Sequence, residues 1–394
     1  MDIQQRLAAM ERLVEIGIML TAETKLDRLL DNIVSEARTL LNVDGATIYL
    51  IHNDGLRFQN THNGSLEKRM GAETFQSKVA PHVVPLTRGS MVGYVALEGE
   101  AEVVNDVRSI DPKKPYRWSD SFDVAMGYRT ECLLTLPLKL NDGKILGVLQ
   151  LVNAASGAFD EAMLPVARSL ASTASAALGN AQLADALREA RLDTVMRLGM
   201  CAEYRDKETS AHIHRMAHIS ALLARKLLLS EVFCDNLLLA APMHDVGKIG
   251  IPDAILQKPG PLTDPEWEVM KTHTLIGGKL LSGTDDVVMA LSVEVALNHH
   301  EKWNGLGYPY GKKGEEIPLS GRIVAVADVF DALMSKRCYK EAFTLAQVKE
   351  IMFEGQGHHF QPGFVDLLFD NIDDVLALYA KYKDSHDERE LFSS

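Results

Sequence analysis

Histidine and carboxylate residues recur in the second half of the chain at spacings that could build a metal site. Glu208 and His212 are four residues apart, which on a helix places both side chains on one face and within reach of one ion. The other members of the set are His244-Asp245, His273, His299-His300, Asp328 and Asp331. Apolar runs border several of these positions, and buried imidazoles and carboxylates need partners that shared metal ions supply. The set therefore predicts a metal centre.

Helices are expected to position these residues. Thr263-Asp264-Pro265-Glu266 has capping-box spacing and predicts the start of the helix that contains His273. A helix beginning near Thr284-Asp285 is expected to end at His299-His300, and Asp328 and Asp331 share a face of a helix expected at 323–334. A single helical histidine is more often an ordinary residue than a ligand, and four are assigned to that class: His214, His218, His358 and His359.

The first half has a different periodicity. Residues 8–41 show helical spacing of apolar positions with a break near 21–24. Strands are expected at 46–51, 93–97, 102–105, 133–140 and 145–152, the last two forming a hairpin around Asn141-Asp142-Gly143. Helices at both ends and antiparallel strands between them are typical of an α+β domain.

A long helix is expected from residue 162 to about 200, because Gly and Pro are nearly absent there. Along it, mostly apolar residues recur at spacings of three, four or seven: Leu170, Ala174, Ala177, Ala181, Ala184, Leu187, Arg191 and Leu198. Such spacing is typical of a two-helix seam between protomers. The alternative is one helix packed on its own domain.

Composition narrows the class of protein. With 41 Lys+Arg against 54 Asp+Glu, the net charge of −13 over 394 residues argues against general binding of nucleic acid polymers or anionic membranes. The four cysteines have no CxxC spacing, which excludes a disulfide framework and a thiolate zinc site. No signal-peptide pattern and no membrane-spanning apolar run is present, so we expect a cytoplasmic protein.

The late histidine set resembles the HD-GYP family, a branch of the HD phosphohydrolase superfamily, over residues 190–385. The motifs that support the resemblance are Glu208-x-x-x-His212, His244-Asp245-Val246-Gly247-Lys248, Ile251-Pro252-Asp253, Lys258-Pro259-Gly260, His273, His299-His300-Glu301, Gly305-x-Gly307-Tyr308-Pro309 and Asp328-Val329-Phe330-Asp331-Ala332-Leu333. The His-Asp pair alone is a weak signal, whereas the ordered ensemble is specific. Ala211 replaces the glycine of many members, which removes no ligand.

The resemblance implies hydrolysis of cyclic di-GMP to linear pGpG by two or three metal ions, and leaves a second cleavage to GMP open. It implies that Asp245 bridges two ions. The ligand shells would be completed by Glu208, His212, His244, His273, His299, His300 and Asp328, with Glu208 typical of members that hold a third ion. Nitrogen and oxygen ligands without thiolate favour iron, with manganese as the alternative.

The same resemblance implies roles at the substrate. Asp245, His244 and Lys248 would be catalytic, with Lys248 touching the scissile phosphate or hydroxide. The substrate-binding residues would be Lys248, Tyr308, Pro309, Asp331, Arg337 and Lys340, of which Arg337 and Lys340 would hold phosphates and Tyr308 and Pro309 would face a guanine. The alternative for the basic residues and the Tyr-Pro pair is solvated surface.

Residues 10–180 resemble a GAF sensory domain. The supporting patterns are Leu41-Asn42-Val43-Asp44-Gly45-Ala46, Gly93-Tyr94-Val95-Ala96, Leu136-Pro137-Leu138 and Phe159-Asp160-Glu161. Cyclic-nucleotide-binding GAF domains often have an Asn-Lys pair here, whereas Asn153 is followed by Ala154, which argues against cyclic-nucleotide sensing. A GAF ligand of unknown identity and a dimerisation module without ligand both stay open.

These resemblances imply a multidomain protein. Its parts would be an α+β GAF domain at 1–180, a connecting helix at 162–200, an all-α HD-type catalytic domain at 201–385 and a tail at 386–394. We expect a homodimer that hydrolyses a cyclic dinucleotide under control of the GAF domain. The alternatives are a phosphodiesterase for 3',3'-cyclic GMP-AMP or a mononucleotide, and a non-catalytic module that binds a cyclic dinucleotide.

Overall fold

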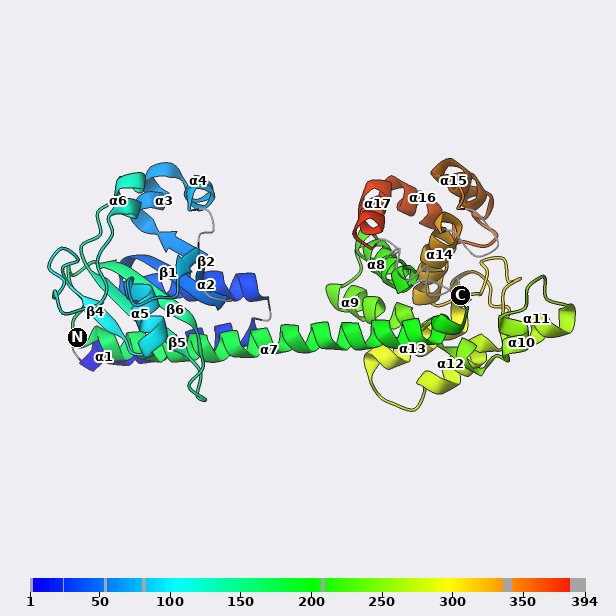
Figure 1. Ribbon diagram of the computed structural model, residues 1–394, viewed down its shortest axis with the longest axis horizontal. Coiled ribbons are helices and arrows are strands. Elements are labelled where there is room, and N and C mark those ends of the chain that lie inside the picture. The colour runs from blue at the N-terminus through cyan, green and yellow to red at the C-terminus, as the bar shows by residue number, and fades with distance from the viewer. Residues whose placement is uncertain are drawn as a thin grey trace. The chain divides into compact units, whose positions relative to one another are not determined.

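The chain forms two compact units joined by one helix. The computed structural model describes residues 3–23, 25–52, 55–79, 83–206, 210–335 and 342–382. The units are Met1–Leu187 and Arg188–Ser394, and helix α7 (Met163–Glu203) begins in the first and ends in the second (Figure 1). Glu208, Arg337, Lys340 and the tail at 386–394, all named by the sequence analysis, lie outside the described residues.

Unit 1 is built on a six-stranded antiparallel sheet with strand order β3-β2-β1-β6-β5-β4. The strands are β1 (Val43–His52), β2 (Gly55–Asn63), β3 (Val83–Pro85), β4 (Glu102–Val104), β5 (Leu133–Lys139) and β6 (Ile145–Ala154). Strands β5 and β6 pair as the expected hairpin, with Leu136 opposite Leu149. The prediction of an N-terminal α+β domain is confirmed.

Helices cover both faces of this sheet. They are α1 (Ile3–Ala22), α2 (Leu26–Leu41), α3 (Gly64–Met70), α4 (Ala72–Lys78), α5 (Met91–Glu98) and α6 (Ser121–Met126). The largest core joins α1, α2 and α7 to one set of strand residues, such as Ile48 and Leu149. The residues that alternate with them, such as Val148, pack with Val95 of α5 on the other face.

Two expectations for unit 1 were wrong. Residues 93–97 form part of helix α5 rather than a strand, because the Ser90 side chain caps the helix by accepting from Gly93 N and the apolar residues repeat at helical spacing. In α7, four members of the expected inter-protomer seam are buried in the core of their own unit: Leu170, Ala174, Ala177 and Ala181. The alternative of a helix packed on its own domain holds for that part of α7.

Unit 2 is helical among its described residues. Its α-helices are α8 (Ser210–Lys226), α9 (Glu231–Ala240), α10 (Asp253–Leu256), α11 (Asp264–Lys271), α12 (His273–Leu281), α13 (Val287–Asn298), α14 (Leu319–Met334), α15 (Leu345–Glu354), α16 (Phe364–Asp370) and α17 (Ile372–Lys381). Short 3₁₀ turns are η1 (Tyr204–Asp206), η2 (Ala241–Met243), η3 (Val246–Gly250) and η4 (Gly314–Glu316). Residues of α8, α9, α13 to α17 and the end of α7 share one apolar core.

Local signals place the helix ends of unit 2. Thr263 and Glu266 form the predicted capping box of α11. That helix ends before His273, which begins α12 instead of lying inside one long helix. Asp286 caps α13 by accepting from Met289 N, and His299 follows its last turn. No helix within the described ranges is long and apolar enough to cross a membrane.

Candidate metal centre

Asp245 lies among the buried histidines of unit 2. Its Oδ1 is 3.1 Å from His273 Nε2 and 3.4 Å from His299 Nε2. Its Oδ2 is 3.3 Å from His244 Nε2 and 2.8 Å from Lys248 Nζ. The two oxygens therefore face different histidines, which is the arrangement that a carboxylate shared by two ions requires.

A glycine lets the chain bring these residues together. A Cβ at Gly247 would lie 1.8 Å from the backbone oxygen of His273. Any other residue would therefore push η3, which directly follows Asp245, away from the start of α12. This close approach gives a physical reason for glycine in the His-Asp-Val-Gly-Lys motif.

Three buried histidines are held with their Nε2 atoms toward the centre. The Nδ1 atom donates to a backbone oxygen in each: His244 to Ala241 at 3.1 Å, His273 to Met270 at 2.7 Å and His299 to Val295 at 3.1 Å. The Nε2 atoms are buried and have no hydrogen-bond partner among the described residues, and neither has Asp245 Oδ1. A donor at Nδ1 and a buried lone pair at Nε2 is how proteins prepare histidine for a metal ion.

His212 is oriented by a carboxylate rather than by the backbone. Its Nδ1 donates to Asp331 Oδ2 at 2.8 Å, and its Nε2 is 3.6 Å from Asp328 Oδ1. Asp331 also accepts from Arg215 Nε at 2.6 Å and from the Tyr379 hydroxyl. Asp328 and Asp331 lie on the same face of α14, as predicted, with the His212 ring between them.

The structure contradicts the expectation that Asp331 binds substrate. Its side chain is fully buried, and both oxygens are occupied by Arg215, His212 and Tyr379. Asp331 therefore fixes the ring of His212 and cannot reach a bound molecule. Arg215 and Tyr379 complete this arrangement. No local spacing predicts either contact, because Asp331 is 116 positions from Arg215 and 48 from Tyr379.

Two sets of side chains could each hold an ion. Group A consists of Asp245, His273, His299 and His300, and group B consists of Glu203, His212 and His244; within each group the ligand atoms lie within 4.8 Å of one another. Glu203, whose side chain is 2% exposed, belongs to none of the motifs recognised in the sequence. Its only sequence signal is a helical one: it lies seven residues after the buried Met196, on the face of α7 that is otherwise apolar.

The electrostatics of the centre favour cations. Burial alone would lower the pKa of His244, but neighbouring carboxylates, first of all Asp245, outweigh it and raise this pKa to about 9. Burial also disfavours the charged form of Asp245, yet the Lys248 ammonium and His244 hold the pKa of Asp245 well below its usual range. Burial, with His299 beside it, holds the pKa of His300 well below its ordinary value, which leaves that ring neutral. The field that favours a proton on His244 equally favours a metal ion.

The loop that contains Tyr308 and Pro309 is held in place by the buried carboxylate of Glu301. Glu301 is 2% exposed and accepts from the backbone N of Tyr310 at 2.7 Å and of Lys312 at 3.0 Å. The Tyr308 ring packs against His300 at 4.8 Å between centroids. Tyr308 and Pro309 are half-buried. Lys248, 9% exposed, lies at the centre through its contact with Asp245.

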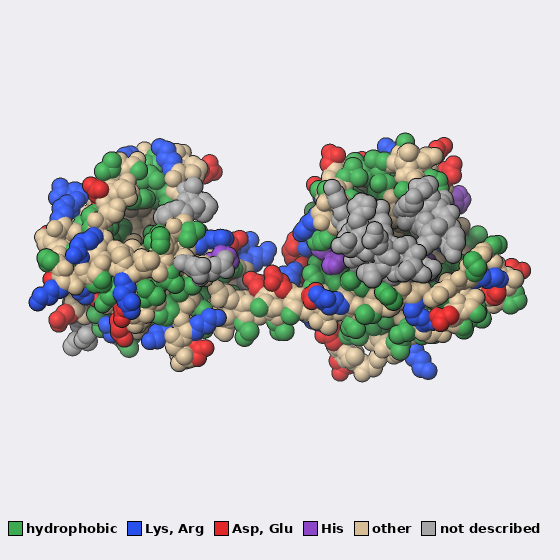
Figure 2. Space-filling model, in the orientation of Figure 1, with side chains coloured by type: hydrophobic (Ala, Val, Ile, Leu, Met, Phe, Trp, Pro, Cys, Tyr) green, Lys and Arg blue, Asp and Glu red, His purple; other side chains and the backbone are tan. Residues whose placement is uncertain are grey.

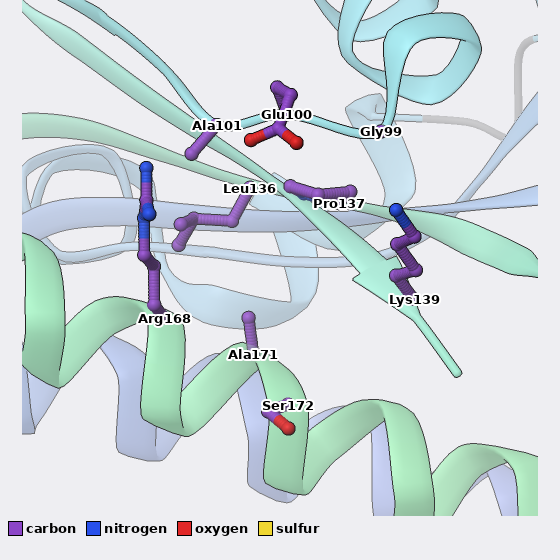
Figure 3. A pocket seen from close by; sticks show the side chains of 9 residues that line it. All are labelled: Gly99, Glu100, Ala101, Leu136, Pro137, Lys139, Arg168, Ala171 and Ser172. Atoms are coloured by element: carbon purple, nitrogen blue, oxygen red, sulfur yellow. The ribbon is translucent and has the colours of Figure 1, made fainter. Parts of the chain in front are cut away.

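A pocket in unit 1 has a different character. It has a volume of about 180 Å³ and lies between the segment after α5, strand β5 and helix α7. Figure 3 shows Arg168 rising from α7 on one side and Lys139 on the other, with Glu100 above. These three charged groups are solvent-exposed, and they include no metal-ligand set.

Comparisons with known proteins agree with this division. Residues 197–363 match the family model described as HD domain, and residues 23–179 match that described as GAF domain. A "3'3'-cGAMP-specific phosphodiesterase 2" of Vibrio cholerae is 43% identical over 198 residues, which are 50% of this chain and 38% of that protein.

Two further relatives are named for cyclic di-GMP. A "Cyclic di-GMP phosphodiesterase" of Vibrio cholerae is 45% identical over 48% of this chain and 42% of its own length, and one of Thermotoga maritima is 45% identical over 48% of this chain and 51% of its own length. The chain thus spans about half the length of these relatives or less. With the fold and the buried histidine centre, the matches show a GAF domain at residues 23–179 followed by an HD domain at residues 197–363.

Proposed function

We propose that the chain is a metal-dependent phosphodiesterase that hydrolyses cyclic di-GMP to linear pGpG. The main support is Asp245, whose Oδ1 faces the Nε2 atoms of His273 and His299 and whose Oδ2 faces the Nε2 atom of His244. Relatives that share 45% of their aligned residues and are named cyclic di-GMP phosphodiesterases support the substrate.

The proposed chemistry follows from what these side chains can hold. Two divalent ions at groups A and B would supply an activated water and neutralise charge on the phosphodiester. Iron is the proposed metal and manganese the alternative, because all ligands are nitrogen and oxygen. Lys248, held 2.8 Å from Asp245, is a cation placed to contact a phosphate at the same point. Tyr308 supplies an aromatic wall beside His300 for a base.

The test is turnover by the purified full chain. Protein loaded anaerobically with Fe²⁺ or Mn²⁺ should convert cyclic di-GMP to pGpG. Chromatography of the reaction mixture would measure the loss of substrate and the formation of product. His218→Gln is a matched control, because this histidine contacts the Tyr382 hydroxyl and belongs to neither group. Metal-loaded protein that binds cyclic di-GMP without cleaving it would instead support the non-catalytic binding module.

A second candidate substrate has its own support. A relative that is 43% identical to this chain is named for 3'3'-cGAMP. Parallel assays at equal concentrations of the two cyclic dinucleotides should give the larger kcat/KM for cyclic di-GMP. A reversed order would assign the chain to cyclic GMP-AMP.

Two proposed phosphate contacts lie outside the described residues. Arg337 and Lys340 remain proposals on the basis of their sequence positions. Arg337→Ala should raise the KM for the cyclic dinucleotide several-fold and leave the metal content unchanged. Unchanged kinetics would remove Arg337 from the site.

We further propose a cytoplasmic homodimer whose GAF domain regulates hydrolysis. The support is an apolar strip on α7, where Leu183 and Leu187, four residues apart, are 71% and 69% exposed. Hydrophobic side chains are visible along this part of α7 in Figure 2. Because isolated exposed leucines on a long helix are best buried against an identical helix, a second copy is the proposed partner.

The proposed dimer can be tested by placing charged side chains on the exposed leucines of α7. The double variant Leu183→Glu/Leu187→Glu should sediment as a monomer, whereas Leu228→Glu, at a leucine that is 91% exposed after α8, should not change the oligomeric state. A double variant that sediments like the wild type would exclude this surface. Deleting residues 1–180 without any change in activity would argue against regulation.

A further inference from the structure

Arg205 makes a cluster of long-range hydrogen bonds just after the end of α7. It lies in η1, and its side chain is 30% exposed. Its Nη1 donates to Ile249 O at 2.8 Å, and its Nη2 donates to Ile251 O at 3.0 Å and to the Asp253 carboxylate. The Arg205 carbonyl accepts from Gln257 Nε2 at 3.2 Å. One residue thus joins η1 to a segment that lies 44 to 52 positions later in the chain.

The backbone contacts are the firm part of this cluster. The Asp253 side chain is 69% exposed, so its ion pair with Arg205 is screened by solvent and contributes little by itself. The two carbonyl oxygens lie at the end of the 3₁₀ turn η3 and just beyond it, where a helical turn leaves acceptors without partners of its own. A guanidinium presents its N–H donors in a rigid plane, which lets one side chain serve both oxygens and the carboxylate, whereas an ammonium has no such fork.

The turn that this guanidinium holds contains Lys248. Lys248 N donates to Asp245 O at 2.9 Å, and Lys248 O accepts from Ile251 N at 3.0 Å, so the residue is part of the same short turn. The turn also packs closely on α12, because a Cβ at Gly250 would lie 3.0 Å from Ile276 Cδ1. Packing on α12 and hydrogen bonds from η1 therefore fix the backbone of this turn.

A fixed backbone matters for Lys248 because its side chain is long. Its Nζ is 2.8 Å from Asp245 Oδ2, and the residue is 9% exposed. A lysine ammonium sits on a flexible stem, so it keeps one position only if the backbone that carries it is held. Displacement by about 1 Å relative to the reacting atoms can cost about 100-fold in rate. A loose η3 would therefore move the cation away from the phosphate that it is proposed to contact.

We propose that Arg205 is a positioning residue of the hydrolytic site. Its hydrogen bonds to Ile249 O and Ile251 O hold η3. The turn in turn keeps Lys248 Nζ beside Asp245 and the bound phosphate. This inference rests on the proposed function, because a phosphate contact of Lys248 is its endpoint. It gives a role to a residue that belongs to neither metal group.

The first test is a double-mutant cycle on turnover of cyclic di-GMP by the Mn²⁺-loaded full chain. Arg205→Ala should lower kcat about 10- to 100-fold and change the KM less than about threefold, because the other contacts of the substrate remain. In a Lys248→Met background, measured at raised enzyme concentration, the same change should lower kcat by less than about twofold. Equal losses in both backgrounds would overturn the proposal, because Arg205 would then not act through Lys248.

Two further variants separate positioning from a general loss of structure. Arg205→Lys keeps the charge but cannot serve both carbonyl oxygens, so its kcat should lie between those of Arg205→Ala and the wild type. Arg197→Ala, which removes an exposed arginine of α7 paired with Asp193, should match the wild type. Bound Mn²⁺ should stay at the wild-type level in these variants, and its loss from Arg205→Ala would contradict a role through Lys248 alone.

A measurement without nucleotide tests the hold on η3 itself. Hydrogen exchange of the Lys248 and Ile251 amides, which are bonded within the turn, should be about tenfold faster in Arg205→Ala than in the wild type, while exchange in α9 and α13 stays unchanged. Unchanged exchange at both amides would show that Arg205 does not hold η3, and faster exchange throughout unit 2 would assign Arg205 to the stability of the fold instead. The expected local change in a chain that hydrolyses no cyclic dinucleotide would refute the proposed function and leave the hold on η3 intact.

Discussion

Two buried aspartates show how the two units differ. Asp123 in unit 1 is 6% exposed and accepts from Thr130 N at 2.9 Å and from Thr130 Oγ1 at 2.8 Å. Asp245 in unit 2 is 7% exposed, yet its Oδ1 has no hydrogen-bond partner among the described residues and faces two imidazole nitrogens. The two aspartates are therefore equally buried but differ in the atoms that their carboxylates face.

The difference lies in what the buried polar atoms are prepared to bind. In unit 1 the aspartate satisfies local donors and so stabilises the loop before β5. In unit 2 the local hydrogen bonds are made by the Nδ1 atoms, which leaves the Nε2 atoms and the Asp245 carboxylate for an ion. Asp245 therefore differs from Asp123 in that its Oδ1 faces imidazole nitrogens instead of accepting from a backbone amide and a hydroxyl.

The largest effect should come from Asp245→Asn. This change keeps the shape of the side chain but removes the charge shared by groups A and B, so turnover of cyclic di-GMP should fall roughly 10³-fold or more. Metal analysis should show loss of bound Mn²⁺ as well. Asp123→Asn is the matched control, and a comparable loss in that variant would break the comparison.

Asp331→Asn should give the next largest effect, because it leaves Arg215 buried without its anionic partner. We expect a loss of about 3 to 5 kcal/mol in the free energy of unfolding. Mn²⁺ affinity should fall by roughly 10- to 100-fold, because His212 loses the acceptor that fixes its ring. Denaturant titration and Mn²⁺ titration measure the two effects, and wild-type values in both would show that Asp331 orients nothing.

Asp123→Asn should affect stability alone. Replacing one acceptor oxygen opposite the Thr130 donors should lower the free energy of unfolding of unit 1 by about 1 to 3 kcal/mol. Hydrogen exchange at β5 reports this local loss, and metal content should stay at the wild-type value. A change in metal content would mean that the two aspartates are not independent.

His359 is a histidine of unit 2 that is largely buried but lies outside both metal groups, so a variant of it shows what burial does without a metal site. Burial lowers the pKa of this histidine to about 4, and its ring stacks on Phe360 at 4.4 Å, but it belongs to neither metal group. Its ordinary pKa is about 6.5. Between pH 6.5 and pH 4, His359 is protonated in the unfolded chain but neutral in the folded chain. The stability of the folded state associated with neutral His359 is therefore fully present above pH 6.5 and is lost as the pH falls toward 4.

The His359 contribution should be on the order of 1 to 2 kcal/mol, because the side chain is partly exposed. Unfolding of the full chain in EDTA, followed between pH 7 and pH 4, should show a shallower pH dependence for His359→Gln than for the wild type. Parallel curves would assign the pH dependence to other groups.

Local patterns in the sequence were sufficient to predict several secondary-structure elements and the helix face that carries two of the carboxylates. The Thr263–Glu266 capping box, the β5–β6 hairpin and the shared face of Asp328 and Asp331 follow from contacts within a few residues. The segment 93–97 was misassigned because a short apolar run can fit a strand or a helix, and the Ser90 cap was not taken into account.

The ordered motifs were enough to identify candidate metal ligands: His212, His244, Asp245, His273 and His299. Tertiary structure alone decided three matters: that Glu203 joins His212 and His244, that Asp331 faces inward to Arg215, and that Leu170 to Ala181 pack in their own unit. The physical reason is range. Helical periodicity ends where α7 ends, so the spacing of Glu203 and His212 in the sequence does not determine how their side chains meet.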